Sequence, residues 1–376
     1  MHSEIGVATS SPGAAPSVVT HGGNLHEAAR LYGIAYAAWL DLSTGINPHG
    51  YPVPPVPPDA WRRLPDEGDD FAACAARYYG APDAEHVLPV AGSQAAIRAL
   101  PAVLPALPAL PTQPASSPES RPESSTRATV GIAPLTYSEY APAFARAGYV
   151  VSALDVACEN LPDTLTHAVV VNPNNPTAAY LDAAKLLRWH AQLSARGGTL
   201  IVDEAFADAM PDVTPRASLA DRVALPGLVV LRSPGKFFGL AGVRAGFVLA
   251  APAQLRALRD VLGAWTVSGP ARHAVTAAFA DRAWQEQMRD RLAADSARLV
   301  ELLHAHRFAS RATPLFAWTD DARATALHRA LAERGIWTRL FAQPASLRFG
   351  LPATPADWQR FELALRESVE AIDATA

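Results

Sequence analysis

A lysine in a glycine-rich, mostly apolar segment is the strongest chemical signal in this sequence. Lys236 lies between Gly235 and the pair Phe237 and Phe238, and Arg244 follows eight residues later. A lysine removed from water has its ammonium form disfavoured, so its amine is available at neutral pH. Such an amine can form a Schiff base with an aldehyde. The arginine could then bind an anionic group of the same ligand. A solvated surface lysine is the alternative, and the two phenylalanines argue against it.

Three further polar segments follow apolar runs. Residues 92–94 read Gly-Ser-Gln and open a helical pattern, where free N–H groups suit a phosphate, although serine is also an ordinary N-cap. Residues 172–177 read Asn-Pro-Asn-Asn-Pro-Thr, with more amides than a rigid turn requires. Asp203 ends an apolar run, where a buried carboxylate is costly unless it has a partner. A protonated pyridine nitrogen is one such partner, and an N-cap or an internal salt bridge is the alternative.

A sheet must bring these segments together. Short apolar runs alternate with helical patterns, which predicts an α/β fold with a mainly parallel sheet covered by helices on both faces. In such sheets, ligands bind beyond the carboxyl ends of the strands, where the four polar segments lie. The expected strands are 87–90, 129–133, 168–171, 199–202, 228–231 and 246–250, and the expected helices start at 94 and cover 138–147 and 182–195.

The pattern changes towards the C-terminus and predicts a smaller α+β domain. We expect helices at 284–303, 324–333 and 355–372, and strands at 336–341 and 346–349. The predicted organisation is an N-terminal segment near the active site at 1–45, a large domain at 46–262 and a small domain at 263–376. Which domain the N-terminal segment packs against stays open. The Pro- and Ser-rich stretch 111–127 cannot bury enough apolar surface to fold, so we expect a mobile loop there.

Composition excludes several classes of protein. The formal net charge of −4 over 376 residues gives no general attraction to nucleic acid or to anionic membranes. No apolar run is long enough to span a membrane, and the first residues lack the layout of a signal peptide. Cys74 and Cys158 stand far apart, which argues against a disulfide scaffold or a zinc ribbon and favours the cytoplasm. No metal-binding spacing occurs, so we expect no metal.

The order of the motifs resembles that of the fold type I aminotransferases, which depend on pyridoxal phosphate. Gly-Ser-Gln, Asn-Pro-Asn-Asn-Pro-Thr, Asp-Glu-Ala-Phe, Ser-Pro-Gly-Lys with its later arginine, and Leu-Arg-Phe-Gly follow one another over nearly the whole chain. Within the family, the sequence is most similar to the threonine-phosphate decarboxylases of the cobalamin pathway, close relatives of the histidinol-phosphate aminotransferases. The segments 21–24, 41–48 and 64–66 carry that likeness. The resemblance also implies a homodimer.

The resemblance implies roles for individual residues. Lys236 would carry the pyridoxal phosphate and then move protons, Asp203 would pair with the pyridine nitrogen, and Tyr137 would stack on the ring. Asn175 would hydrogen-bond the phenolic oxygen of the cofactor and lie near the substrate. Arg348 would bind the α-carboxylate of the substrate with Asn47 beside it, and His21 would contact the substrate phosphate. The residues expected to hold the cofactor phosphate are Gly92, Ser93, Gln94, Ser233 and Arg244.

Two positions depart from the pattern of many aminotransferases. Phe206 replaces a tyrosine that bonds the phenolic oxygen of the cofactor, so that bond is absent. Leu64 replaces a tyrosine that reaches the cofactor phosphate of the partner subunit, which puts this contact in doubt. Both changes are compatible with the decarboxylase branch.

The expected reaction is decarboxylation of a small phosphorylated amino acid, L-threonine O-3-phosphate, to (R)-1-amino-2-propanol O-2-phosphate. The bond at Cα that breaks is the one perpendicular to the cofactor ring, and Arg348 would set that orientation. A histidinol-phosphate-type aminotransferase is the first alternative. A non-catalytic, pyridoxal-phosphate-binding module of a regulator is the second, and the presence of both Lys236 and Asp203 argues against it.

Overall fold

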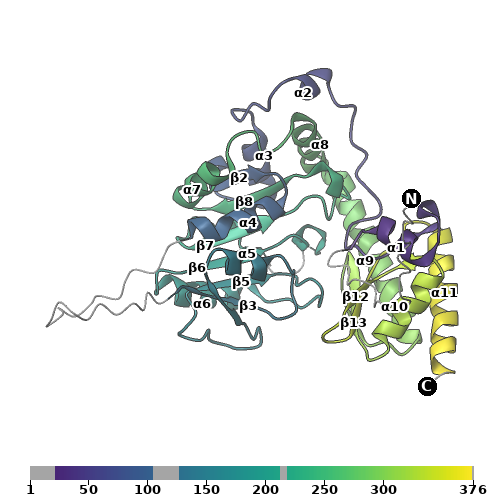
Figure 1. Cartoon of the computed structure of the whole chain (residues 1–376). Coiled ribbons are helices and arrows are strands. Elements are labelled where there is room, and N and C mark those ends of the chain that lie inside the picture. The colour runs from purple at the N-terminus through teal and green to yellow at the C-terminus, as the bar shows by residue number, and fades with distance from the viewer. Residues whose placement is uncertain (1–21, 105–126, 212–217, 375–376) are drawn as a thin grey trace, which may run out of the picture.

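The computed structural model describes residues 22–104, 127–211 and 218–374. Figure 1 shows two bodies: a large domain around a twisted sheet, and a smaller domain that carries both ends of the described chain. His21 and residues 111–126 of the predicted loop at 111–127 lie outside the described residues. The α/β fold expected from the sequence is confirmed.

The large domain is built on a seven-stranded sheet in the order β2-β8-β7-β6-β5-β3-β4. All neighbouring pairs are parallel except those of β8, which runs antiparallel to both β2 and β7. The strands are β2 (Val87–Val90), β3 (Thr129–Ile132), β4 (Val150–Ala153), β5 (His167–Val171), β6 (Thr199–Asp203), β7 (Leu228–Arg232) and β8 (Gly246–Ala250).

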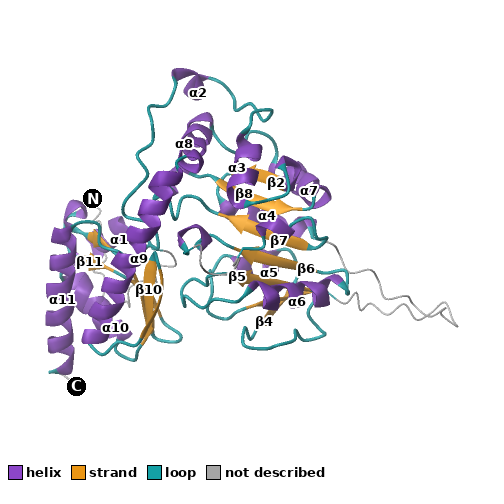
Figure 2. Cartoon of the chain, turned by 180° about the vertical axis from the view of Figure 1, so that it is seen from behind, coloured by secondary structure: helices purple, strands orange, loops and turns teal. Residues whose placement is uncertain are grey.

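Helices cover both faces of this sheet because its central strands are apolar on both sides (Figure 2). Val170, Val202 and Val230 belong to one buried cluster, whereas Val169 and Ile201 belong to the other, as the alternation of a strand requires. The first face carries α3 (Phe71–Tyr79), α6 (Ala183–Ser194) and α8 (Gly269–Ala280), and the second carries α4 (Ser93–Val103), α5 (Tyr140–Arg146) and α7 (Pro252–Leu262).

The predicted strands of the large domain agree with the structure to within one or two residues. β4 was not predicted, because its sequence Val-Val-Ser-Ala is short and lies at the edge of the sheet. Val150 and Val151 are 47% and 37% exposed, so this strand needs no continuous apolar run.

The small domain contains a four-stranded antiparallel sheet in the order β12-β13-β10-β9. The expected single strand at 336–341 is two strands that belong to different sheets, and β9 and β10 were not predicted because they are short and partly polar. The strands are β9 (Ser310–Thr313), β10 (Phe316–Asp320), β11 (Ile336–Trp337), β12 (Arg339–Phe341) and β13 (Ser346–Gly350), and the helices are α9 (Arg282–Ala305), α10 (Ala324–Glu333) and α11 (Pro355–Asp373).

The N-terminal segment packs on the small domain. Its strand β1 (Leu40–Asp41) pairs in parallel with β11, and its helix α1 (Leu25–Tyr32) lies beside α10. Trp39 forms a small buried cluster with Ala332 and Trp337. The chain then crosses to the large domain, where α2 (Pro58–Arg62) projects at the top of Figure 1. Short 3-10 turns lie at Tyr36–Ala38, Ala84–His86, Ala207–Ala209, Ala220–Arg222 and Ala241–Val243.

The helix α8 lies after the predicted domain boundary at residue 262, yet it packs with the large domain. Its buried residues Val275 and Phe279 belong to the core of the large domain, and the helix packs against α3 and α2. The next helix, α9, links the two domains: Trp284 in its first turn stacks on Phe238, and Leu299 further along is buried under the small sheet. By these contacts, the chain leaves the large domain near Asp281 rather than at residue 262.

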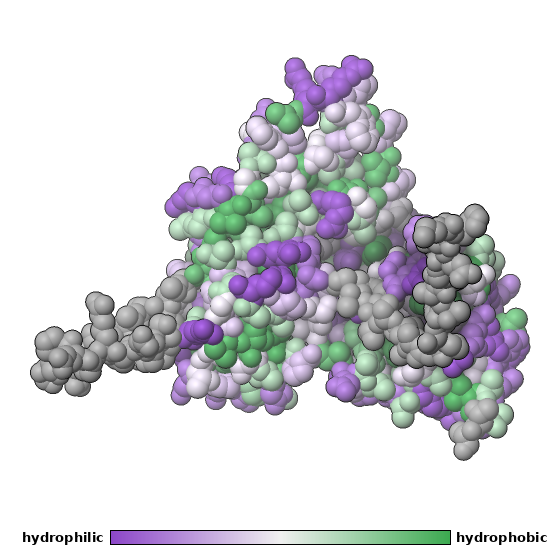
Figure 3. Space-filling view, viewed as in Figure 1, coloured by the Kyte–Doolittle hydropathy of each residue, from purple (hydrophilic) through white to green (hydrophobic). Residues whose placement is uncertain are grey.

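The face of the molecule seen in Figure 3 mixes polar and apolar residues, with hydrophilic side chains gathered over the projecting α2 region. Among the described helices, none is both long enough and apolar enough to cross a membrane.

Candidate active site

The ends of five strands meet at one edge of the large sheet. β2, β3, β5, β6 and β7 all deliver their carboxyl ends there, and the antiparallel β8 begins there, which brings Arg244 to the same edge. A cavity of about 120 Å³ opens at this point. It is lined by all nine residues that the sequence analysis expected around the cofactor: Gly92, Ser93, Gln94, Tyr137, Asn175, Asp203, Ser233, Lys236 and Arg244.

Lys236 projects into this cavity from a loop that is anchored on both sides. Phe237 and Phe238 are fully buried beneath it. Asn47 braces the loop, because its backbone N–H donates to the Lys236 carbonyl at 2.9 Å and its Nδ2 donates to the Phe237 carbonyl at 2.7 Å. Burial, followed by the charge of Arg348, lowers the pKa of the Lys236 amine to about 8. The neutral, nucleophilic amine is therefore accessible near neutral pH.

Asp203 is a buried carboxylate with no cation paired to it among the described residues. It is 3% exposed, and burial raises its pKa. Its Oδ2 accepts a hydrogen bond from the Tyr140 hydroxyl at 2.7 Å, and its Oδ1 accepts one from the Ala205 N–H at 3.0 Å. Both donors are neutral, and the positive charges of Lys236 and Arg232 act on Asp203 only through longer-range attraction. A cationic N–H in the cavity, such as that of a protonated pyridine, would complete the site.

The residues around Gly92 form a cradle for an anion. Ser93 begins α4, whose first N–H groups have no partner within the helix. The Ser233 hydroxyl donates to the Ser93 Oγ at 2.9 Å, so both hydroxyls meet at this point. Gly92 has φ +77, and a Cβ there would lie 2.6 Å from Arg244 Nη2, so the arginine packs against a position that only glycine suits. The donor set fits a phosphate.

Tyr137 and Gln94 form part of the cavity wall. The Tyr137 hydroxyl donates to Gln94 Oε1 at 3.0 Å, and Gln94 Nε2 donates to Glu139 Oε2 at 2.6 Å. Burial raises the pKa of Tyr137 to about 12, so its hydroxyl keeps its proton. The Gln94 side chain is thus used within the wall, which leaves its backbone N–H as the group available to a phosphate.

Arg348 reaches the same region from β13 of the small domain. Its guanidinium donates to Asn175 Oδ1 and to the Ser43 carbonyl, while its buried Nε has no partner in the described structure. Burial lowers its pKa to about 10, which still leaves it cationic at neutral pH. A buried guanidinium bound only to neutral acceptors is suited to an incoming carboxylate.

Arg339 is a residue that the sequence analysis missed. It lies directly opposite Arg348 in the β12–β13 pair, and the charge of Arg339 contributes to the lowered pKa of Arg348. Like charges on facing positions of neighbouring strands are unfavourable, and an anion bound between them relieves the repulsion. Hairpin register could have found this pair, since a four-residue turn joins the two strands.

Four other positions singled out in the sequence are His21, Asn47, Phe206 and Leu64. His21 lies outside the described residues, so its predicted contact with the substrate phosphate stays a prediction. Asn47 lies beside Lys236 as described above, and its Oδ1 also accepts from the His49 N–H at 2.8 Å, so its side chain is already occupied. Phe206 is buried, with its ring centroid 5.8 Å from Lys236 Nζ, and has no hydroxyl to offer. Leu64 is 67% exposed and does not line this cavity.

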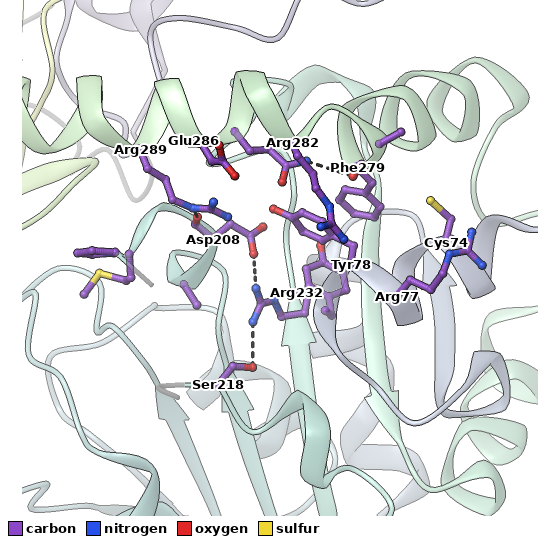
Figure 4. A pocket seen from close by; sticks show the side chains of 16 residues that line it. Cys74, Arg77, Tyr78, Asp208, Ser218, Arg232, Phe279, Arg282, Glu286 and Arg289 are labelled. Carbon is purple, nitrogen blue, oxygen red and sulfur yellow. Dashed lines mark hydrogen bonds and ion pairs between the residues drawn. The ribbon is translucent and has the colours of Figure 1, made fainter. Parts of the chain in front are cut away.

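A larger cavity of about 650 Å³ lies between α3, the start of α9 and the end of β7 (Figure 4). Its central cation, Arg232, is already paired with Glu204 and Asp208 and contacts Ser218 Oγ at 3.2 Å. None of the expected site residues lines it. The smaller cavity holds the reactive amine, and we therefore assign the active site there.

Within the described ranges, no group of three or more His, Cys, Asp or Glu residues could hold a metal ion. The fold and the site together define a fold type I enzyme, with a lysine amine, a buried carboxylate and an anion cradle at the strand ends. The model of the class I and II aminotransferase family matches residues 65–363, and the chain belongs to this family.

Two relatives match over nearly their whole length. The threonine-phosphate decarboxylase of Pseudomonas aeruginosa is 48% identical over 350 residues, which cover 93% of this chain and 97% of that protein. The threonine-phosphate decarboxylase of a Sinorhizobium species is 38% identical over 362 residues, covering 92% and 97%. Among solved structures, the histidinol-phosphate aminotransferase of Sinorhizobium meliloti in complex with pyridoxal 5'-phosphate has a TM-score of 0.73 at 18% identity, covering 93% and 95%. That likeness concerns the fold.

Proposed function

We propose that the cavity binds pyridoxal 5'-phosphate through Lys236. When bound, this cofactor supplies an electron-withdrawing ring that stabilises negative charge on the substrate Cα. The cradle of Ser93, Ser233 and Arg244 receives the phosphate, and Asp203 supplies the anion that a protonated ring nitrogen needs. Tyr137 forms a wall for one ring face, and Asn175 lies near enough to Arg348 to serve both cofactor and substrate.

We propose that the reaction is decarboxylation of L-threonine O-3-phosphate to (R)-1-amino-2-propanol O-2-phosphate, a step of cobalamin biosynthesis. The observation that carries this choice is the 48% identity to the threonine-phosphate decarboxylase of Pseudomonas aeruginosa over 93% of the chain. The fold alone does not distinguish this activity from that of a histidinol-phosphate aminotransferase, since the Sinorhizobium meliloti enzyme shares it.

In this proposal, Arg348 binds and orients the carboxylate that departs. The Arg348 Nε has no partner among the described residues, and the other two nitrogens donate only to neutral acceptors. The guanidinium can therefore donate two parallel hydrogen bonds to a substrate carboxylate. Arg339, which faces Arg348 across the β12–β13 pair, is the cation that we expect to bind the substrate phosphate. Loss of CO2 breaks the bond between Cα and the carboxylate, and a proton replaces the carboxylate on Cα. Lys236, with its pKa lowered to about 8, is the group that can carry this proton near neutral pH.

We also propose that the protein is a homodimer in the cytoplasm. Large apolar side chains are exposed around α2 and after α7, including Trp61 at 69%, Leu64 at 67% and Trp265 at 56%. The Trp265 N–H donates to Glu67 Oε1 at 2.8 Å, so the segments that carry these side chains lie together. An exposed apolar region of this kind is typical of an interface. A single molecular mass equal to the monomer in light scattering would contradict the dimer.

The experiment that tests the function compares two substrates. The purified protein with pyridoxal phosphate is supplied with L-threonine O-3-phosphate and no keto acid, and CO2 and the phosphorylated amine are measured. We expect both products in equal amounts. Turnover of histidinol phosphate with 2-oxoglutarate, without CO2 from threonine phosphate, would identify an aminotransferase instead. Cofactor binding without turnover in either assay would favour a regulatory module.

A further inference from the structure

Tyr140 is a buried tyrosine that the proposed chemistry does not use. It begins α5, is fully buried, and donates from its hydroxyl to Asp203 Oδ2 at 2.7 Å. Asp203 ends β6, so this bond joins two elements that are 63 residues apart in the chain. Tyr137, three residues earlier, lines the cavity and packs edge-to-face on Tyr140 with ring centroids 6.2 Å apart. One short segment thus supplies a cavity wall and a donor to the buried carboxylate.

The need to satisfy a buried hydroxyl does not explain this arrangement. A backbone carbonyl satisfies a tyrosine hydroxyl at much lower cost, as it does for Tyr149, which donates to the Pro101 carbonyl at 3.1 Å in the same part of the core. Burying a carboxylate is far more expensive than burying a hydroxyl. Asp203 has no ion-pair partner among the described residues. The Tyr140–Asp203 pair therefore carries a buried negative charge that is not needed to satisfy the Tyr140 hydroxyl or to stabilise the fold.

The direction of the hydrogen bond is fixed. Burial and the nearby Asp203 raise the pKa of Tyr140 well above its usual value, so its hydroxyl always donates. Burial raises the pKa of Asp203, and the Tyr140 hydrogen bond is the first of the interactions that oppose this rise. Tyr140 and the Ala205 N–H bind different carboxylate oxygens, which restricts rotation of the group. A carboxylate has about four lone-pair positions, so two remain for another donor.

We propose that Tyr140 is a positioning residue that holds the Asp203 carboxylate ionised and oriented for the ring nitrogen of pyridoxal phosphate. It acts through Asp203 and does not line the cavity itself. The inference rests on the cofactor of the proposed function and not on its substrate. All measurements below are made without substrate, so they stand even where the assignment of the decarboxylase reaction fails.

The first test compares Tyr140→Phe with the matched control Tyr149→Phe, since each removes one hydroxyl from the same core. The readouts are the dissociation constant of pyridoxal phosphate and the pH midpoint of its absorption change when bound. Removing a hydrogen bond to a charged group should weaken cofactor binding about 10-fold. The midpoint should move to higher pH. With Asp203 less fully ionised, the ring nitrogen is protonated less often and withdraws less electron density, so the nitrogen that joins Lys236 to the cofactor loses its proton at a higher pH. The control should change neither value.

A double-mutant cycle with Asp203→Asn separates positioning from a general loss of packing. If Tyr140 acts through Asp203, then Tyr140→Phe should weaken cofactor binding by less than about threefold in the Asp203→Asn background. Equal effects in both backgrounds, or a Tyr140→Phe protein that behaves like Tyr149→Phe, would overturn the proposal.

A second variant at the same position covers the case in which Tyr140→Phe does not fold. Replacement of Tyr140 by 3,5-difluorotyrosine keeps the shape and the hydroxyl but makes it a stronger donor. The absorption midpoint should then move to lower pH, opposite to the phenylalanine variant. An unchanged midpoint in this protein would count against the role of Tyr140.

Discussion

Asn175 and Arg348 are joined by a hydrogen bond in which the amide oxygen of Asn175 accepts from the guanidinium of Arg348. Asn175 follows β5 of the large domain, and Arg348 lies on β13 of the small domain. The residue expected on the cofactor and the residue expected on the substrate are therefore held together across the two domains. The position of the small domain sets where a substrate carboxylate would bind relative to Lys236.

The first prediction concerns Arg348→Lys. A lysine keeps the charge but cannot make a two-pronged pair with a carboxylate while bonding both Asn175 and Ser43. We expect kcat/KM for threonine phosphate to fall about 100-fold, which corresponds to roughly 3 kcal/mol. Arg298→Lys is the control, because Arg298 lies over the Trp358 ring at 4.4 Å on the outer side of the small domain. Equal kcat/KM values for the two variants would contradict the assignment of Arg348.

The second prediction uses the fact that the chain has only two lysines, Lys185 and Lys236. Reduction of the protein with borohydride after addition of pyridoxal phosphate should attach the cofactor to Lys236, as detected by peptide mass spectrometry. Lys236→Ala should lose both the label and the absorption band of lysine-bound cofactor. Attachment at Lys185 alone would refute the assignment, because Lys185 lies on α6, outside the cavity.

The third prediction follows from the pKa of Lys236, which is lowered to about 8 from 10.5. Between these values the unfolded chain binds the proton more tightly than the folded one, so the apoprotein should gain stability as the pH rises. Below pH 8 the buried ammonium should cost roughly 2 kcal/mol, reduced from the full shift because the amine opens onto the cavity. Lys236→Met removes this cost. Its advantage over the wild type in urea unfolding should therefore be large at pH 7 and small at pH 10, and an advantage independent of pH would contradict the lowered pKa.

The fourth prediction concerns Gly92→Ala. The added Cβ would lie 2.6 Å from Arg244 Nη2 and push the guanidinium out of the phosphate cradle. We expect cofactor binding to weaken about 10-fold or more, as for the loss of a charge-assisted contact. Gly80→Ala is the control, because Gly80 also has a positive φ, of +74, but open space around it. Gly80 is in the left-handed helical region, so Gly80→Ala should lose about 1 kcal/mol of stability from the backbone. Gly92, with φ 77 and ψ 153, is in a region essentially restricted to glycine, so Gly92→Ala should lose about 1–3 kcal/mol. Only Gly92→Ala should affect the dissociation constant of pyridoxal phosphate.

The fifth prediction concerns the ion cluster in the larger cavity. Arg232→Met leaves the carboxylates of Glu204 and Asp208 buried without their cation, which should cost about 3–5 kcal/mol of unfolding free energy. Arg188→Ala should cost less than about 1 kcal/mol, since Arg188 and its partner Glu159 are mostly exposed. Chemical denaturation of the two variants measures the difference. A similar small loss in both would mean that the cluster does not stabilise the strand ends.

The local signals of the sequence predicted the large sheet well. Buried parallel strands such as β5 and β6 are continuous apolar runs, and their polar ends identify the edge where a ligand binds. Strands without such runs were missed: β4 lies exposed at an edge, and β9 reads Ser-Arg-Ala-Thr. The cofactor residues were named through a family resemblance that depends on motif order, and the fold brings all nine to one cavity.

The sequence by itself determined the reactive lysine, the alternation of strands and helices, and the polar segments at the strand ends. Each of these features depends only on residues that are close together in the chain. Only the tertiary structure decided the partners of those residues. Tyr140 meets Asp203, Arg339 faces Arg348, and Arg232 joins Glu204 and Asp208 because the chain folds distant segments together. Such pairings depend on strand register and on the packing of one domain against another, and a linear pattern of residue types does not specify either.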